Sequence, residues 1–145
     1  MKVKILTKLI NIYVEFYKIQ YLRYYSIMLP KQYRLKKRTA FNATYRTGVS
    51  FHKDGITLFC GKKKKEDMTT KIGFVVSKKT HKRAVKRNRI KRLMRESVRL
   101  YIKDSGMLNT EYMSIIFVAS TKLLNKNYRD IDIGIKKLMS IITNA

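Results

Sequence analysis

The sequence is poor in several residues that commonly stabilise or activate proteins. Its 145 residues include one cysteine, Cys60, one proline, Pro30, and nine acidic residues against 34 lysines and arginines. A single cysteine excludes an internal disulfide framework and favours a reducing compartment. There is no run of about 18 uncharged apolar residues, which argues against a transmembrane helix. No internal repeat occurs, so the length indicates one domain with a real core.

The chain also lacks a recognisable catalytic constellation. His52, His81 and Cys60 do not have the spacing of metal ligands. Asp130 and Asp132 are two residues apart and would not share one face of a helix. Neither a phosphate-cradling glycine loop nor a G-x-S-x-G motif occurs. These absences favour a protein that binds a partner over one that carries its own chemistry.

What the sequence has in excess is positive charge. The formal net charge is +25, yet 45% of the residues are hydrophobic, so the chain is not a disordered basic tail. A charge of this size predicts a polyanionic partner, either nucleic acid or an anionic membrane surface.

The charge is concentrated between Lys78 and Lys103, which holds twelve lysines or arginines and a single acid, Glu96. Good helix formers dominate from Ala84 onward, and no proline or glycine interrupts them. At about 100° per residue one stripe is apolar: Ile90, Leu93, Met94, Val98 and Tyr101. The opposite side carries Asn88, Lys91, Arg92, Arg95 and Arg99. Like charges four residues apart repel, and only Arg92–Glu96 and Glu96–Arg99 offer relief. The ridge therefore favours a nucleic-acid partner over a merely solvated face.

Residues 1–27 are apolar and aromatic, but Lys8, Glu15, Lys18 and Arg23 interrupt them. No small-residue cleavage site follows, which argues against a secretory signal. Three interpretations stay open. The segment is a helix that packs on the domain, an amphipathic membrane-surface helix, or an extension preceding a true translation start at Met28. In each case one basic domain is expected over residues 28–145.

Residues 39–46 predict a short helix, with Thr39 as its N-cap and Gly48 just past its end. Phe41 and Tyr45 share one face of this helix, either as part of the core or as part of a binding site. Residues 49–61 predict one or two strands, with Asp54-Gly55 as the turn signal.

Alternation within residues 56–60 points one set of side chains toward the core, namely Ile56, Leu58 and Cys60. Phe59 then points to the other face of the sheet. There it would stack on a base, or pack beneath Phe41 and Tyr45, or do both along one groove.

The second half of the chain gives clearer signals. Residues 62–67 predict a lysine-rich loop ending in Glu66-Asp67, more typical of a solvated tip than of a specific site. Residues 71–77 predict a strand that leads directly into the basic helix, and residues 111–120 a central strand that is apolar on both faces. Asn127 predicts the N-cap of a last helix with an apolar stripe of Ile131, Ile135, Leu138 and Ile142. The predicted order is α-β-β-β-α-β-α.

The segment from Ser77 to Glu96 resembles the signature of the bacterial ribonuclease P protein subunit. The matching residues are Ser77-Lys78-Lys79 and Arg83-Ala84-Val85-Lys86-Arg87-Asn88-Arg89-Ile90-Lys91-Arg92-Leu93-Met94-Arg95-Glu96. Residues elsewhere in the chain also resemble those of the family, namely Leu29–Leu35, Phe41, Tyr45, Gly48, Phe59 and Lys71-Ile72-Gly73. The likeness covers about residues 28–143. It departs at residues 80–83, where many members have a shorter link containing glycine.

The resemblance implies an α/β (α+β) two-layer sandwich, similar to a domain found in ribosomal proteins, with a left-handed β-α-β crossover. The general rule for such crossovers would predict the right-handed form.

The resemblance also implies endonucleolytic removal of the 5′ leader from precursor tRNA. The catalyst would be the RNA subunit, which would hold Mg²⁺ together with the substrate. Expected partners are ribonuclease P RNA and precursor tRNA, with no membrane and no small-molecule substrate, and the expected compartment is cytoplasmic. The alternative is a non-enzymatic ribosomal or general RNA-binding protein.

The family's binding positions carry over residue by residue. The RNA subunit would be bound by Arg83, Arg87, Asn88, Arg89, Lys91, Arg92 and Arg95. The leader would lie in a cleft formed by Phe41, Tyr45, Phe59, Lys78 and Lys79. No catalytic residue and no metal ligand is expected on the protein.

Overall fold

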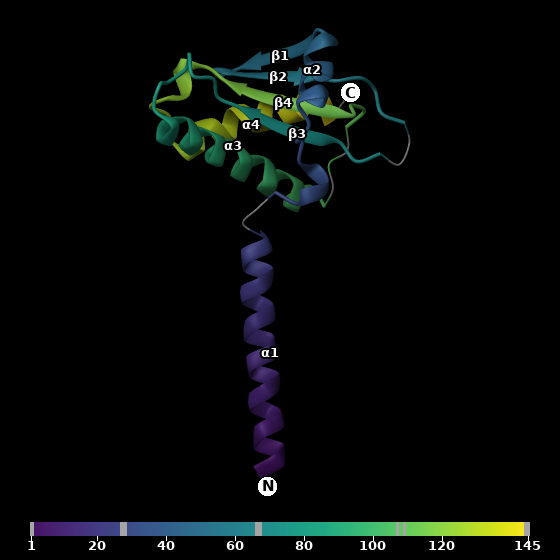
Figure 1. The fold of residues 1–145 in the computed structure, drawn as a ribbon, viewed down its shortest axis with the longest axis vertical. Coiled ribbons are helices and arrows are strands. Elements are labelled where there is room, and N and C mark those ends of the chain that lie inside the picture. The colour runs from purple at the N-terminus through teal and green to yellow at the C-terminus, as the bar shows by residue number, and fades with distance from the viewer. Residues whose placement is uncertain (1, 27–28, 66–67, 107, 109, 144–145) are drawn as a thin grey trace.

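The computed structural model describes residues 2–26, 29–65, 68–106, 108 and 110–143. Its elements, labelled in Figure 1, are α1 (Lys2–Ser26), α2 (Arg38–Arg46), β1 (Val49–Lys53), β2 (Ile56–Cys60), β3 (Lys71–Val75), α3 (Ala84–Ser105), β4 (Ser114–Ala119) and α4 (Tyr128–Thr143). Short 3-10 helices occupy Lys31–Tyr33 and Thr121–Leu123. The order from α2 onward is the one that the sequence predicts.

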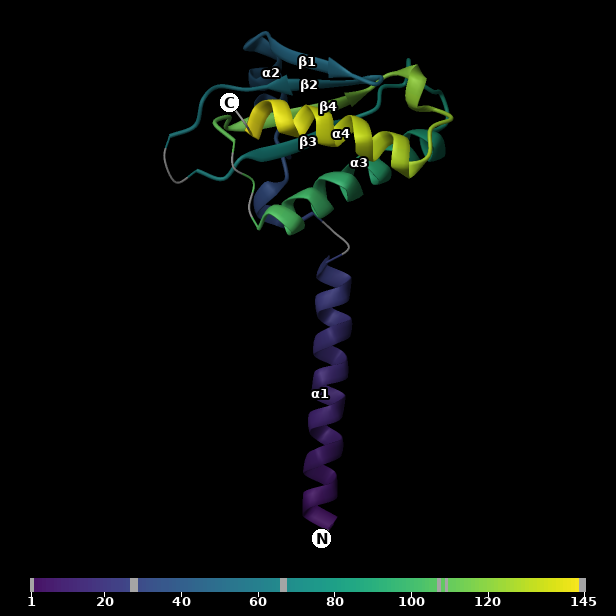
Figure 2. The same cartoon turned by 180° about the vertical axis from the view of Figure 1, so that it is seen from behind.

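The four strands form one sheet in the order β1-β2-β4-β3. The β1–β2 and β2–β4 pairs are antiparallel, whereas β3 and β4 pair in parallel. Figures 1 and 2 show α3 and α4 on one face of the sheet and α2 on the other. The predicted sandwich is therefore confirmed, with α3 connecting two adjacent parallel strands. The left-handed sense of this crossover stays a prediction from the resemblance.

The core lies between the sheet and the layer formed by α3 and α4. The alternation in β2 is confirmed, because its three inward side chains, Ile56, Leu58 and Cys60, have no exposed surface. The predicted stripe of α4 is buried throughout. On α3, Ile90, Met94 and Val98 are buried as predicted, while Leu93 and Tyr101 are half-buried. Burial, reinforced by the charge of Glu111, raises the pKa of Cys60 to about 12, which fits a core thiol.

Local turn and cap signals are mostly confirmed. Asp54 and Gly55 have φ angles of 51° and 83°, as a two-residue type I′ hairpin turn requires. The Asn127 side-chain oxygen accepts a hydrogen bond from the Asp130 amide at 3.0 Å, which caps α4. Gly48, with φ 70°, follows α2.

The prediction of Thr39 as the N-cap of α2 is wrong. The helix begins at Arg38. Its N-cap residue is Lys37, whose backbone is still extended. The Lys37 carbonyl already accepts hydrogen bonds from the amides of Ala40 and Phe41, at 3.0 and 3.2 Å. Thr39 therefore lies inside the first turn, because the helix starts as soon as the extended segment beside β3 ends.

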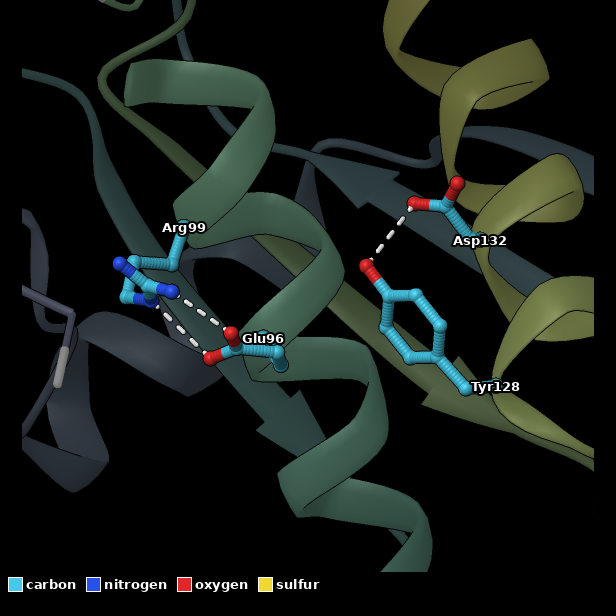
Figure 3. Close-up of polar contacts among 4 residues, drawn as sticks. All are labelled: Glu96, Arg99, Tyr128 and Asp132. Atoms are coloured by element: carbon cyan, nitrogen blue, oxygen red, sulfur yellow. Dashed lines mark hydrogen bonds and ion pairs between the residues drawn. The ribbon is translucent and has the colours of Figure 1, made fainter. Parts of the chain in front are cut away.

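A polar bridge joins α3 to α4. The buried Ser97 hydroxyl donates to the Asp132 carboxylate at 2.6 Å, and Tyr128 donates to the same oxygen at 3.4 Å. Lys136 completes the cluster with an ion pair of 2.8 Å to Asp132. Figure 3 shows Tyr128 and Asp132 on one side of α3 and the Glu96–Arg99 pair on α3 itself. This cluster anchors one side of α3 to α4.

Replacing Asp132 with alanine is expected to lower the free energy of unfolding by about 1–3 kcal/mol at neutral pH, because the Ser97 hydroxyl is then buried without its acceptor. Asp132→Asn is the matched control, since it removes the charge but keeps an acceptor. Urea unfolding of both variants and of the unmodified chain measures the difference. An alanine variant as stable as the asparagine variant would contradict the role assigned to Ser97.

The same variants test a pH dependence. Burial pushes the pKa of Asp132 upward, but hydrogen bonds from Lys136 and Ser97 outweigh it and leave the pKa below its usual value. A carboxylate with a depressed folded pKa stabilises the protein above its unfolded pKa of about 3.9, and this contribution is lost as the pH falls through the folded value. The difference in free energy of unfolding between the unmodified chain and the Asp132→Asn variant should therefore become smaller below about pH 4.

Helix α1 stands apart from the sandwich. Figure 1 shows it extending away from the sheet and from the helices that cover it. All of its side chains from Lys2 to Tyr17 are exposed. Within the described ranges, no helix combines the length and apolar character needed to cross a membrane. The predicted start at Met28 lies outside the described residues, as does the predicted Glu66-Asp67 end of the lysine-rich loop.

Candidate nucleic-acid interface

The N-terminal half of α3 presents cationic side chains because its apolar stripe turns the remaining positions outward. Asn88, Arg92 and Arg95 are exposed, and Lys91 is half-buried at the flank. Among the described residues, no ion pair involves Arg89, Arg92 or Arg95. Their charge is therefore free to meet an anionic partner.

Two arginines of this half also hold neighbouring loops. Arg87 donates to the carbonyl oxygens of His81 and Lys82 at 2.8 and 2.5 Å, which ties the link after β3 to the helix. The Arg89 guanidinium reaches the Lys126 carbonyl through two long hydrogen bonds of 3.3 and 3.4 Å. Arg83 occupies the N-cap position, and its amide donates to the ring of His81 at 3.1 Å. These contacts position the predicted RNA-binding residues without consuming all their donors.

Arg95 contacts an aromatic ring of β3 and feels the charges of two other arginines. Its charged end lies over the Phe74 ring, 5.9 Å from the ring centroid. Burial, followed by the charges of Arg34 and Arg92, lowers the pKa of Arg95. A phosphate placed among the three guanidinium groups would relieve their mutual repulsion.

Arg34 had no predicted role of its own. The structure places it beside β3, because the Leu35 amide donates to the Ile72 carbonyl at 2.9 Å and Arg34 forms a parallel β-bridge with Ile72. The Arg34 side chain donates to the Leu29 carbonyl at 2.6 Å. Residues 29–35 resemble the family in sequence. They show no hydrophobic periodicity that would have predicted a position beside β3.

Arg99, in contrast, does not belong to the free cationic surface. It forms two hydrogen bonds to the Glu96 carboxylate, at 2.6 and 3.0 Å, as Figure 3 shows. The hydrogen bond to Glu96 raises the pKa of Arg99. The predicted ridge is thus neutralised at this end, and the open part of α3 runs from Arg83 to Arg95.

The aromatic residues meet on the sheet face that α2 covers. The Tyr45 and Phe59 rings are in edge contact, with centroids 4.9 Å apart and planes at 80°. Phe41 lies over Gly73 of β3, so close that a Cβ atom there would come within 2.6 Å of its ring. Thr44 and Ser114 share a hydrogen bond of 2.5 Å between α2 and β4. Phe41 and Tyr45 thus form the second packing layer, as one of the predictions stated.

Beyond α2, the same sheet face stays partly open. The strand registers align His52, Thr57, Val118 and Val75 in one row across β1, β2, β4 and β3. Thr57, Val118 and Val75 are half-buried and His52 is exposed. We call this row, with Phe41, Tyr45 and Phe59 beside it, the sheet strip. Lys78 and Lys79 are exposed in the turn that follows β3, and they continue the strip beyond the sheet.

Replacing Gly73 with alanine is expected to displace Phe41 and to lower the free energy of unfolding by about 1–3 kcal/mol, the usual cost of overpacking. The new methyl group would meet the Phe41 ring at 2.6 and 2.8 Å. The double variant Gly73→Ala/Phe41→Leu should recover part of the loss, because the smaller side chain can move aside. Thermal unfolding measures both, and the absence of any recovery would contradict a clash at Phe41.

No group of three or more histidine, cysteine or acidic side chains able to hold a metal ion occurs among the described residues. The expectation that Mg²⁺ is held by RNA and substrate is a separate matter, which stays a prediction.

Comparisons with known proteins agree with this geometry. The family model described as Ribonuclease P matches residues 29–143, which leaves out α1. The ribonuclease P protein component of Clostridium kluyveri is 35% identical over 113 residues, covering 74% of this chain and 91% of the relative. That of Clostridium acetobutylicum is 36% identical over 110 residues, covering 76% and 88%.

Solved structures show the same fold. The RNase P protein of Staphylococcus aureus is 28% identical, with a TM-score of 0.62, over 75% of this chain and 94% of that protein. The RNase P protein of Thermotoga maritima, at 23% identity, supports the fold alone, with a TM-score of 0.62 over 75% and 96% of the two chains.

Proposed function

The chain belongs to the bacterial ribonuclease P protein family, and from this premise we propose that two surfaces of its domain divide the binding work. As a ribonuclease P protein component, it acts in the maturation of tRNA 5′ ends and has an RNA partner. The alternative of a general, non-enzymatic RNA-binding protein is not favoured by these comparisons.

The first surface is the α3 arginine face, defined as Arg83, Arg87, Asn88, Arg89, Lys91, Arg92 and Arg95. It binds the ribonuclease P RNA. Arginine and lysine that contact phosphates release condensed counterions, which supplies affinity, and the fixed helix sets the register of the complex. Arg34 adds to this surface because its charge acts on Arg95.

The second surface is the sheet strip, which binds the single-stranded leader of precursor tRNA. Aromatic side chains stack on bases of any sequence, at about 1–3 kcal/mol per base. Lys78 and Lys79 neutralise leader phosphates at the end of the strip. Mature tRNA lacks the leader, so this surface favours the precursor.

In this proposal the RNA subunit, with Mg²⁺ shared between it and the substrate, cleaves the phosphodiester bond. The protein's residues bind and orient the two nucleic acids, and they neutralise phosphate repulsion, so that less Mg²⁺ is needed. The compartment is the cytoplasm.

One observation carries the proposal. β3 contributes Val75 to the sheet strip, carries Gly73 under Phe41, and then leads through Lys78 and Lys79 into α3. A single β-α unit therefore positions both surfaces, so the leader and the RNA subunit would be held at a fixed separation.

The test is cleavage of a leader-bearing precursor tRNA by a bacterial ribonuclease P RNA at low Mg²⁺, with and without the full chain. Strong stimulation, decreasing as Mg²⁺ is raised, is the expected result. No stimulation by a folded protein, with an RNA subunit from the same source, would overturn the proposal.

A further inference from the structure

Helix α1 takes no part in the two surfaces described above. The family match begins at residue 29, after the end of the helix. Its large apolar side chains between Val3 and Tyr17 are each between 52% and 76% exposed. They are Val3, Ile5, Leu6, Leu9, Ile10, Ile12, Tyr13, Val14, Phe16 and Tyr17. Such a continuous exposed apolar surface calls for a covering partner.

The apolar side chains of α1 are not distributed at random. At 3.6 residues per turn they spread over an arc of about 200°, with Tyr13 near its centre. The remaining side of the helix carries Lys4, Thr7, Lys8, Asn11 and Glu15. Among residues 2–17, whose side chains the structure describes, Lys2 alone interrupts the arc, at the first turn, where a long side chain can reach water.

The width of this arc indicates which kind of partner can cover it. A second copy of α1 would cover only the narrow seam of a two-helix coiled coil, and two chains of charge +25 repel each other. RNA offers phosphates, sugars and base faces, and bases stack on aromatic rings, but they do not cover a wide arc in which most side chains are aliphatic. The chain's own domain leaves the arc exposed (Figure 1). A lipid surface covers a wide arc while the polar strip stays in water.

We propose that α1 lies in the plane of an anionic lipid bilayer, with its apolar arc among the acyl chains and Lys4 and Lys8 at the headgroups. Residues 2–17, which carry the arc, would cover about 24 Å along the surface. Tyr13 and Tyr17 are stacked, with centroids 6.2 Å apart, on the arc, and aromatic side chains favour the membrane–water boundary. This partner departs from the sequence-based expectation of no membrane.

Charge complementarity supports an anionic surface, since the chain carries +25 overall. When the α3 arginine face is occupied by RNA, its attraction to lipid headgroups is lost. Attachment of the complex to the bilayer then depends on the apolar arc of α1. The proposal is independent of the assignment of the two nucleic-acid surfaces.

The first experiment uses fluorescence, because the chain contains no tryptophan. Tyr13→Trp places one fluorophore at the centre of the arc, and Asn11→Trp places it on the polar strip as the matched control. The full-length variants are mixed with vesicles of equal parts phosphatidylcholine and phosphatidylglycerol. A blue shift of the Tyr13→Trp emission, with little shift for Asn11→Trp, is expected. Electrostatic adsorption of the basic domain alone would shift neither.

The second experiment measures partitioning onto the same vesicles in the presence of excess ribonuclease P RNA. Ile10→Asp and Asn11→Asp change the net charge equally but place the carboxylate on opposite sides of the helix. Ile10→Asp should weaken partitioning about tenfold or more, and Asn11→Asp about threefold or less.

Three outcomes would overturn the proposal. They are equal emission from the two tryptophan variants, equal partitioning of the two aspartate variants, and a blue shift that depends on protein concentration without vesicles. The last would assign the arc to a second copy of the chain.

Discussion

Replacing Arg89 and Arg92 together with alanine is expected to weaken binding of ribonuclease P RNA by at least about 100-fold, since each hydrogen bond to a charged partner contributes about 1.5–3 kcal/mol. Both residues lie on the open part of α3, and neither is in an ion pair among the described residues. The fold should survive. Arg89 gives up only two long hydrogen bonds, to Lys126.

The measurement is equilibrium binding of the RNA over a series of salt concentrations. If the two arginines contact phosphates, the slope of log affinity against log salt should fall by about two. The control variant Lys62→Ala/Lys103→Ala removes the same formal charge from exposed positions outside the α3 arginine face. An equal loss in both double variants would mean that net charge alone attracts the RNA, and it would contradict a specific face.

Replacing Phe59 with leucine is expected to reduce the preference for precursor over mature tRNA about tenfold, because leucine fills much of the same space but offers no ring for a base to stack on. Phe59 is half-buried in edge contact with Tyr45. Loss of one stacked base costs about 1–3 kcal/mol. Affinity for mature tRNA should change little.

Phe51→Leu provides the matched control. Phe51 lies on the adjacent strand β1, is also half-buried, and packs against the core on the opposite face of the sheet. The same chemical change there should alter stability without altering the preference between the two tRNAs. Binding of both tRNAs to the reconstituted holoenzyme measures the ratio. Equal losses for precursor and mature tRNA with Phe59→Leu would remove Phe59 from the leader site.

The two predictions separate the two surfaces. The arginine double variant should impair assembly with the RNA subunit and leave the leader preference of assembled complexes intact. The leucine variant should assemble normally. If both variants lost the same property, one surface would serve both nucleic acids, and the division of labour would be wrong.

Much of the fold could be predicted from local patterns. Alternation identified the inward side of β2, and a period of 3.6 residues identified the buried stripes of α3 and α4. Asp54-Gly55 and Asn127 predicted a turn and a cap, because their backbone requirements depend on a few adjacent residues. The family itself was recognisable from residues 77–96, since the cationic pattern lies in one short continuous stretch that ends in the first half of α3.

The predicted site residues are found partly in contact with one another. Tyr45 and Phe59 touch, and Phe41 lies beside them over Gly73. Their roles toward RNA and leader remain predictions. The Glu96–Arg99 pair, one of the two that the sequence offered, forms. The charge of Arg34, to which no role was assigned, acts on Arg95.

The sequence by itself determined which side of each element is apolar, where the charge gathers, and which family the chain resembles. Only the tertiary structure decided which elements are neighbours. β4 pairs between β2 and β3, so Phe59 and Gly73 come to flank Ile116 although they are distant in the chain. The physical reason is that periodicity encodes the orientation of a side chain relative to its own element. Which elements become neighbours depends on how the apolar faces of all the elements can be buried at the same time, and that is a property of the whole fold.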